Sequence, residues 1–163
     1  MPRLNAAARE LIASGALAHL VTLNRDGSPQ VSVIWVGLDG DELVSGHLDP
    51  GQLKMRNMAR DPRVALSFEG SAVNGIGLRE NLVLHARVRL TEAGAPELLS
   101  RLAQTYVGPG TVFPPFPDPP PGLIAHYAIT KITGVGDWAA AEPPPADAGG
   151  APAPSAGRAE PDR

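Results

Sequence analysis

Two Asp-Gly turns divide the first third of the chain into three segments rich in β-forming residues. Residues 19–23 read His-Leu-Val-Thr-Leu, and Asp26-Gly27 follows them closely. Residues 30–38 then place alternate side chains on two faces, and Asp39-Gly40 separates them from residues 42–47. Asp-Gly between β-rich segments favours a tight hairpin turn. The pattern predicts a three-stranded antiparallel meander, which favours a sandwich or barrel over a parallel sheet.

Three later segments, residues 63–69, 81–91 and 124–133, continue the β pattern. In residues 81–91 every second side chain is aliphatic, as expected of a strand with one buried face. Six strands in one open sheet would leave two unpaired edges, and closure into a barrel removes them. We therefore expect a mostly β fold with short α-helices, built as a six-stranded antiparallel barrel.

Three short helices are expected between these strands. Residues 5–15 have Asn5 as a side-chain cap and Gly15 as a terminator. Residues 52–60 end before Asp61-Pro62, because a residue that precedes proline avoids the helical conformation. Residues 96–106 begin with a proline, which suits the first turn of a helix.

The 163-residue chain suits one domain, which we place at residues 1–138. Residues 139–163 contain nine alanines, six prolines and three glycines, with no larger apolar side chain. Such a segment cannot bury enough surface to offset its ordering entropy, so we expect a disordered tail. Its removal should leave folding and ligand binding intact.

A proline-dense stretch at residues 109–121 holds seven prolines and two phenylalanines. Proline fixes the backbone and removes a donor, so this stretch should be an extended, stiff loop. Phe113 and Phe116 are expected to pack at a subunit interface or, as the alternative, to cover a binding site.

Composition excludes several functional classes. The net charge of −3 argues against a nucleic-acid partner, and the scarcity of strand-borne aromatics argues against an oligonucleotide-binding barrel. The absence of cysteine excludes disulfides and thiolate metal sites, and it fits a reducing cytoplasm. No apolar stretch approaches the roughly 18 residues of a membrane helix, so no membrane partner is expected.

The four histidines, His19, His47, His85 and His126, show no metal-ligand spacing. A nucleophile elbow and the common phosphate-binding glycine motifs are also missing from the sequence. We therefore predict no metal site and name no catalytic residue. Tyr106, His47 and His126 are possible proton donors, although a structural role is favoured for each.

Residues 52–63 carry a local excess of three positive charges in an acidic chain. The members are Lys54, Arg56, Arg60 and Arg63, with Asp61 the only acid. A helix entrance with free N–H groups and a favourable dipole is suited to a phosphate. The alternative is a solvated helix face with no ligand.

Helical geometry separates these basic residues. At about 100° per residue, Met55, Met58 and Ala59 point toward a core, and the arginines point roughly away from it. Lys54 lies at the border of the apolar face, in the first turn. Lys54 is therefore the candidate for a phosphate contact, whereas Arg60 and Arg63 are expected to face solvent.

Several short segments, in this order and spacing, resemble the flavin/deazaflavin oxidoreductase superfamily of pyridoxamine 5′-phosphate oxidase-like split barrels. The segments that carry the resemblance are residues 19–23, 26–32, 54–57 (Lys-Met-Arg-Asn) and 60–64 (Arg-Asp-Pro-Arg-Val). Residues 106–110 and 134–138 match part of the family. The resemblance covers about residues 5–138 and is greatest to actinobacterial enzymes that use coenzyme F-420, a deazaflavin.

The resemblance implies an FMN-binding type of split barrel that forms a homodimer, with cofactor sites at the subunit interface. Lys54 matches the family's phosphate-binding lysine, and Gln52 stands where many relatives have an arginine for the same phosphate. The remaining implied cofactor-binding residues are Gln30, Ser32 and Val33 along the ring, Ser45 and His47 near the ring and ribityl chain, and Arg56 and Asn57 at conserved family positions. Asn57 is also suited to bracing its helix.

Three functions remain open on this basis. The first is an oxidoreductase that transfers hydride from reduced coenzyme F-420 to a small unsaturated or heteroaromatic substrate. The second is an FMN-dependent relative of pyridoxamine-phosphate oxidase. The third is a protein that binds the flavin or deazaflavin without catalysis. In the first two, the cofactor carries the reactive chemistry and the protein supplies binding and orientation.

Overall fold

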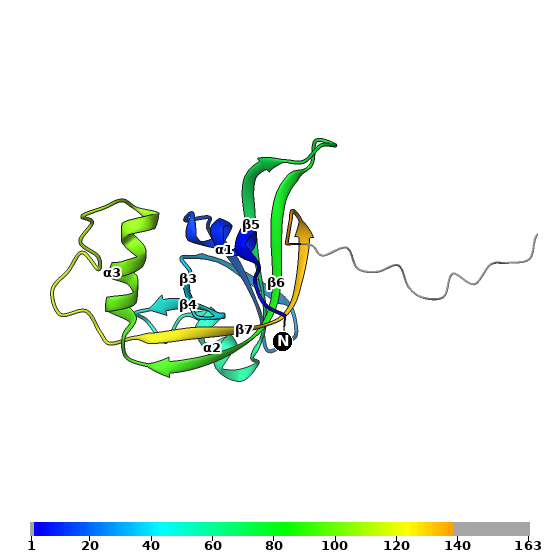
Figure 1. The fold of residues 1–163 in the computed structure, drawn as a ribbon. Coiled ribbons are helices and arrows are strands. Elements are labelled where there is room, and N and C mark those ends of the chain that lie inside the picture. The colour runs from blue at the N-terminus through cyan, green and yellow to red at the C-terminus, as the bar shows by residue number, and fades with distance from the viewer. Residues whose placement is uncertain (1, 139–163) are drawn as a thin grey trace, which may run out of the picture.

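One antiparallel sheet of seven strands, curled around a shared core, dominates residues 2–138, the part of the chain that the computed structural model describes (Figure 1). The elements in chain order are α1 (Ala6–Ala13), β1 (Ala18–Leu23), β2 (Pro29–Ile34), β3 (Gly37–Asp39), β4 (Glu42–His47), α2 (Leu53–Arg60), β5 (Arg63–Val73), β6 (Arg79–Glu92), α3 (Ala95–Tyr106) and β7 (Leu123–Val135). The mostly β architecture is as predicted. The expected tail at residues 139–163 lies outside the described residues.

The strand count and the connection of the first strands differ from the prediction. Residues 30–38 form two strands instead of one, so the sheet has seven strands and not six. The strand order is β2-β1-β5-β6-β7-β4-β3, which places β2 and β3 at opposite edges. The predicted three-stranded meander is therefore wrong. Two hairpins, β1–β2 and β3–β4, lie at the two ends of the sheet, and the barrel is split between them.

The break between β2 and β3 has a specific cause. Val36 lies between the two strands, and its N–H donates to the hydroxyl of Tyr106 at 3.1 Å. The same hydroxyl donates toward the Val36 carbonyl at 3.0 Å. Because buried backbone groups require partners, a side chain of α3 replaces the strand ladder at this point. The chain can then cross from one edge of the sheet to the other.

The β5–β6 hairpin is longer than the sequence predicted and projects from the barrel (Figure 1). Its tip is a turn in which the Asn74 side chain accepts hydrogen bonds from the N–H groups of Ile76 and Leu78. The glycines Gly75 and Gly77 belong to this turn, as expected of a loop before the fifth predicted strand.

The core is almost entirely aliphatic. Alternate side chains of the central strands fill it, as the spacing in β6 predicted; the most buried include Leu20, Leu66, Phe68, Leu82, Leu84 and Tyr127. Helix α1 covers one opening with Ala8 and Ile12. Trp138 closes the core near the end of β7, where its indole N–H donates to the Asn81 carbonyl at 3.0 Å.

The helix ends agree with the capping residues in the sequence. The Asn5 side chain accepts from the Ala8 N–H at 3.0 Å, and Gly15 takes the left-handed conformation that ends the first helix. Gln52 precedes α2 without capping it through its side chain. None of the helices within residues 2–138 combines the length and the apolar character that crossing a bilayer requires.

Candidate functional site

Helix α2 contributes side chains to two separate hollows in the surface. The first, here called the Lys54 cleft, has a volume of about 370 Å³ and is lined chiefly by Val33, Trp35, His47, Gln52, Lys54 and Phe113. The second, the Arg56 hollow, has a volume of about 590 Å³ and is lined chiefly by Asn24, Arg25, Leu53, Arg56, Asn57 and Arg60. The Arg56 hollow is larger, but six of the seven residues that line it are charged or polar types, and none of the seven is aromatic. The Lys54 cleft combines one cation, Lys54, and one carboxylate, Asp49, with mainly apolar and aromatic residues, which is typical of a small-molecule site.

Lys54 is the only cation among the residues that line the Lys54 cleft. Its side chain is half-buried, and this burial lowers the pKa of its ammonium group. Within residues 2–138 no carboxylate forms an ion pair with it. A partly desolvated ammonium without a counterion is stabilised by a bound anion. The environment of Lys54 therefore favours the binding of an anion.

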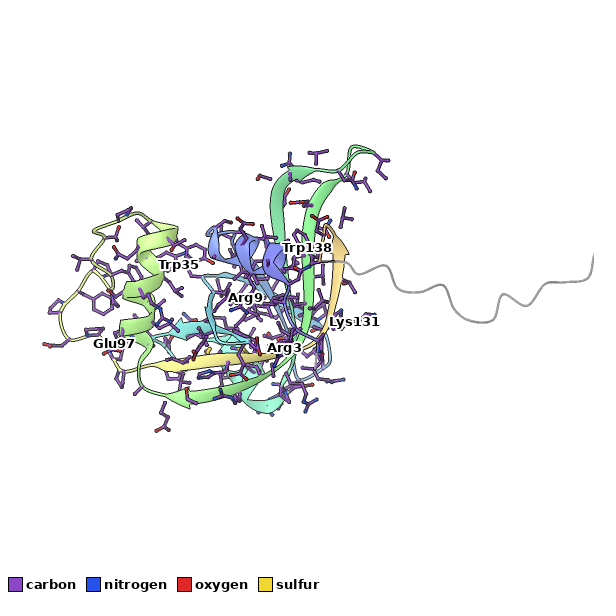
Figure 2. All side chains as sticks on the ribbon, viewed as in Figure 1. Arg3, Arg9, Trp35, Glu97, Lys131 and Trp138 are labelled. Carbon is purple, nitrogen blue, oxygen red and sulfur yellow. The ribbon has the colours of Figure 1, made fainter. Side chains whose placement is uncertain are left out.

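Aromatic side chains form one wall of the Lys54 cleft. Trp35 stacks on Tyr106 of α3, with ring centroids 5.3 Å apart and planes 9° apart. Phe113 lies against the same indole, with centroids 5.1 Å apart and planes tilted by 54° (Trp35 is labelled in Figure 2). Phe113 belongs to the proline-dense loop, so this loop borders the cleft. Phe116, from the same loop, is exposed and is not part of the cleft lining.

His47 joins the cleft to a buried chain of hydroxyl groups. Its Nε2 lies 2.7 Å from the Ser45 hydroxyl, which lies 2.8 Å from the hydroxyl of Tyr127. Burial, and secondarily the charge of Lys54, lowers the pKa of His47 to about 3. Burial also raises the pKa of Tyr127. All three groups are therefore neutral around pH 7.

A second polar network attaches α2 to the β1–β2 hairpin. Buried Asn57 donates to the Thr22 hydroxyl at 3.1 Å and to the Asn24 side chain at 2.9 Å. Thr22 in turn donates to the Gln30 side-chain oxygen at 2.8 Å, and Gln30 donates to the Ser32 hydroxyl at 2.8 Å. This network fixes the position of the helix that carries Lys54.

The residues implied as cofactor ligands lie in four places. Val33, His47, Gln52 and Lys54 come together in the Lys54 cleft. Arg56 and Asn57 line the Arg56 hollow. Gln30 and Ser32 belong to the Asn57 network, and Ser45 is fully buried behind His47.

The helical-face prediction for α2 needs two corrections. Ala59 is exposed and does not face the core, whereas Asn57 is buried with Met55 and Met58. Arg60 is exposed, as expected, but its guanidinium is not free in solvent. It donates to the Leu23 carbonyl and to the Asn57 side chain, because α2 packs against the end of β1. Arg63 pairs with Asp61 at 2.7 Å.

Sequence reasoning missed three residues that shape the site: Trp35, Thr22 and Tyr127. Phe113 was expected either to cover a binding site or to pack at a subunit interface, and it lines the cleft. A fully buried threonine in the first predicted strand, one residue from its end, gives no signal of its own. The aromatic residues were visible as rare residue types, yet their convergence depends on α3 and the proline-dense loop.

Tyr106 and His126 lie outside the Lys54 cleft lining. The Tyr106 hydroxyl holds Val36, and His126 Nε2 lies 3.0 Å from the Thr91 hydroxyl. Within residues 2–138, no three His, Cys, Asp or Glu side chains gather in a geometry that holds a metal ion.

Comparison with known proteins gives one match by family and several by structure. The family model for pyridoxamine 5′-phosphate oxidase matches residues 4–126. No curated protein matches the chain. A solved structure of an F-420 reductase is 25% identical, covers 77% of this chain and 94% of its own, and has a TM-score of 0.63.

Two further solved structures share the fold at lower identity. A conserved hypothetical protein from Mycobacterium tuberculosis is 17% identical, with a TM-score of 0.61, and the match covers 82% of this chain and 85% of that one. A heme binding protein from Mycobacterium smegmatis is 20% identical, with a TM-score of 0.57, and the match covers 83% of this chain and 55% of that one. Proteins with different names therefore share this architecture, so the fold alone does not define the function.

Proposed function

The chain belongs to the pyridoxamine 5′-phosphate oxidase family, and from that premise we propose that the Lys54 cleft binds a flavin-type cofactor by its phosphate. The observation that carries this proposal is the half-buried Lys54 ammonium, which has no carboxylate partner within residues 2–138. A phosphate would supply the missing negative charge. The ammonium acts as a point charge with three donors, which suits one end of a phosphate group.

The remaining cleft residues fit the rest of such a cofactor. Val33 of β2 and Trp35, just after that strand, supply an apolar surface on which a flat ring can pack, and Gln52 supplies an amide in the same lining as Lys54. The volume of about 370 Å³ lies within the roughly 300–1,000 Å³ typical of small-molecule sites. Gln30, Ser32 and Asn57 contribute by holding α2 against β1, and Ser45 contributes through His47.

We further propose that the cofactor is coenzyme F-420 and that the protein is an oxidoreductase. The reduced deazaflavin supplies a hydride, and a small unsaturated or heteroaromatic molecule receives it. The 25% identical F-420 reductase supports this assignment. The chain's own residues then bind the phosphate, orient the ring and exclude water through the aromatic wall.

A second copy of this chain is proposed to complete the site. Strand β2 lies at an edge of the sheet, and its outward side chains Val31 and Val33 are 58% and 54% exposed. An exposed edge strand with apolar side chains is normally covered by another surface. Because Val33 also lines the Lys54 cleft, a partner packed on β2 would lie beside the bound cofactor. The homodimer and the interfacial cofactor site implied by the resemblance fit this arrangement.

The test is a titration of purified protein with FMN and with coenzyme F-420, followed by fluorescence or absorbance. Tight binding of F-420 with weak binding of FMN is expected. Uptake of FMN alone would replace the F-420 proposal with the FMN-dependent alternative. Bound F-420 without reduction of any member of a broad substrate panel would favour a binding protein. Failure to bind either molecule would contradict the cofactor proposal.

A further inference from the structure

The buried hydroxyl chain behind the cleft links two paired strands. Tyr127 lies on β7, and Ser45 and His47 lie on the neighbouring strand β4. The exposed fraction is 0% for Tyr127 and Ser45 and 5% for His47, which forms part of the cleft wall. The backbone at His47 is fixed as well, because Gly122 packs so closely against its carbonyl that a Cβ there would overlap it.

Two directions of hydrogen bonding are compatible with these distances. In the first, Tyr127 donates to Ser45, and Ser45 donates to His47 Nε2. In the second, Nε2–H donates to Ser45, Ser45 donates to Tyr127, and Tyr127 donates to the Met58 sulfur 3.9 Å away. A neutral imidazole carries one proton, so the direction decides which ring nitrogen is the donor.

Chemical complementarity favours the first direction. A phenol is more acidic than an aliphatic alcohol, so Tyr127 is the better donor and its oxygen the poorer acceptor. The unprotonated nitrogen of a neutral imidazole is a stronger acceptor than a hydroxyl oxygen, so His47 is the best acceptor of the three groups. The first direction therefore starts at the best donor and ends at the best acceptor, and successive bonds polarise one another. The second direction leaves the phenol proton with a weak sulfur acceptor.

The first direction places the proton of His47 on Nδ1. Nδ1 of His47 has no hydrogen-bond partner within residues 2–138. Among these residues, the side-chain nitrogen that is both buried and without a partner is Nδ1 of His126. Nδ1 of His47 is therefore accessible, and the surface that His47 lines is the Lys54 cleft. The burial of the ring and, secondarily, the nearby Lys54 charge both oppose a second proton.

We propose that Tyr127, acting through Ser45, fixes His47 as the Nδ1–H tautomer, so that the cleft presents one neutral N–H donor to its ligand. The ligand atom that this donor recognises is an acceptor, such as a carbonyl oxygen or an unprotonated ring nitrogen of a flat heterocycle. This inference rests on the proposed function and assigns Tyr127 and Ser45 as positioning residues. Lys54 and His47 would then bind two chemically different parts of one molecule: Lys54 an anionic group and His47 a neutral acceptor.

The tautomer can be measured directly in unliganded protein by two-bond ¹H–¹⁵N correlation spectroscopy of the histidine rings at pH 7. The wild-type protein should show a neutral His47 with the proton on Nδ1. Tyr127→Phe removes only the first donor, so Ser45 can then accept from Nε2–H, and the signal should shift toward the Nε2–H form. Tyr106→Phe, which removes the only other tyrosine hydroxyl, is the matched control and should leave the His47 signals unchanged.

Ligand titration completes the test. Tyr127→Phe should weaken binding of the cofactor that the wild-type protein takes up, F-420 or FMN, by about 2- to 10-fold, the effect of one neutral hydrogen bond. Thr130→Val, which removes an exposed hydroxyl on the same strand and outside the cleft lining, should not weaken it. A wild-type Nε2–H tautomer, an imidazolium, or a Tyr127→Phe spectrum identical to wild type would overturn the inference even if binding is tight. Failure of both cofactors to bind would contradict the proposed function. It would not bear on the tautomer of His47, because the tautomer is measured in unliganded protein.

Discussion

The hydroxyl of Tyr106 occupies the position that a neighbouring strand would otherwise take beside Val36. It accepts the Val36 N–H at 3.1 Å and lies 3.0 Å from the Val36 carbonyl, although the two residues are 70 positions apart in the chain. The Ala16 carbonyl lies 3.2 Å from the same hydroxyl. One side chain of α3 therefore connects the segment between β2 and β3 to the segment that precedes β1.

Removal of that hydroxyl in Tyr106→Phe should lower the free energy of unfolding by about 1–3 kcal/mol, because the backbone groups of buried Val36 lose their partner. The ring stack on Trp35 is retained, so the loss isolates the hydrogen bonds. Urea denaturation followed by tryptophan fluorescence measures the change. A stability equal to that of the wild type would show that water replaces the hydroxyl at no cost.

Loss of the Lys54 charge should weaken cofactor binding selectively. Lys54→Ala is expected to lower the affinity by about 1.5–3 kcal/mol, the contribution of a hydrogen bond to a charged group, or roughly 10- to 150-fold. Lys131→Ala is the matched control, since Lys131 is the only other lysine and Figure 2 places it away from Trp35. Equal affinities of the two variants would remove Lys54 from the site.

The affinity of the Lys54 cleft should also depend on pH in a definite direction. Burial lowers the pKa of Lys54, so its charge is lost at a lower pH than that of an ordinary lysine. Affinity for an anionic cofactor should therefore fall as the pH rises through this lowered pKa. Lys54→Arg keeps its charge to higher pH and should show a flatter alkaline limb in the same titration. Identical pH profiles would indicate that another group titrates.

Asn57 should matter for stability more than any exposed residue of α2. In Asn57→Ala, the buried Thr22 hydroxyl and the Asn24 side chain lose a donor, at a cost of about 1–3 kcal/mol for each group left unpaired. Arg56→Ala, at the exposed neighbouring position, should change stability by no more than about 0.5 kcal/mol. Chemical denaturation of both variants gives the comparison, and equal small losses would contradict the bracing role.

The Asp61–Arg63 pair predicts a specific loss of stability in acid. Hydrogen bonds from the Arg63 side chain and backbone lower the pKa of Asp61 to about 2 from an ordinary value of 3.8. The unfolded chain therefore takes up the proton first, so the stabilisation is complete above about pH 4 and disappears as the pH falls toward 2. Asp61→Asn should lose less stability than the wild type over that interval. Parallel denaturation curves at each pH test this expectation.

Much of the fold followed from local signals. The capping side chain of Asn5, the two-residue periodicity of residues 81–91 and the Asp-Gly turns each depend only on neighbouring residues, and each element formed where it was expected. The border position of Lys54 in its helix also followed from helical geometry, and it lines the cleft.

The sequence by itself therefore determined the type and approximate position of nearly every element, because backbone preference and side-chain periodicity are local properties. Only the tertiary structure decided that residues 30–38 form two strands at opposite edges of the sheet, since the partner of Val36 is a hydroxyl on α3. It likewise decided that Asn57 is buried, that Phe113 meets Trp35, and that Tyr127 stands behind His47. Each of these contacts joins residues far apart in the chain, and their pairing depends on how the whole sheet curls around its core.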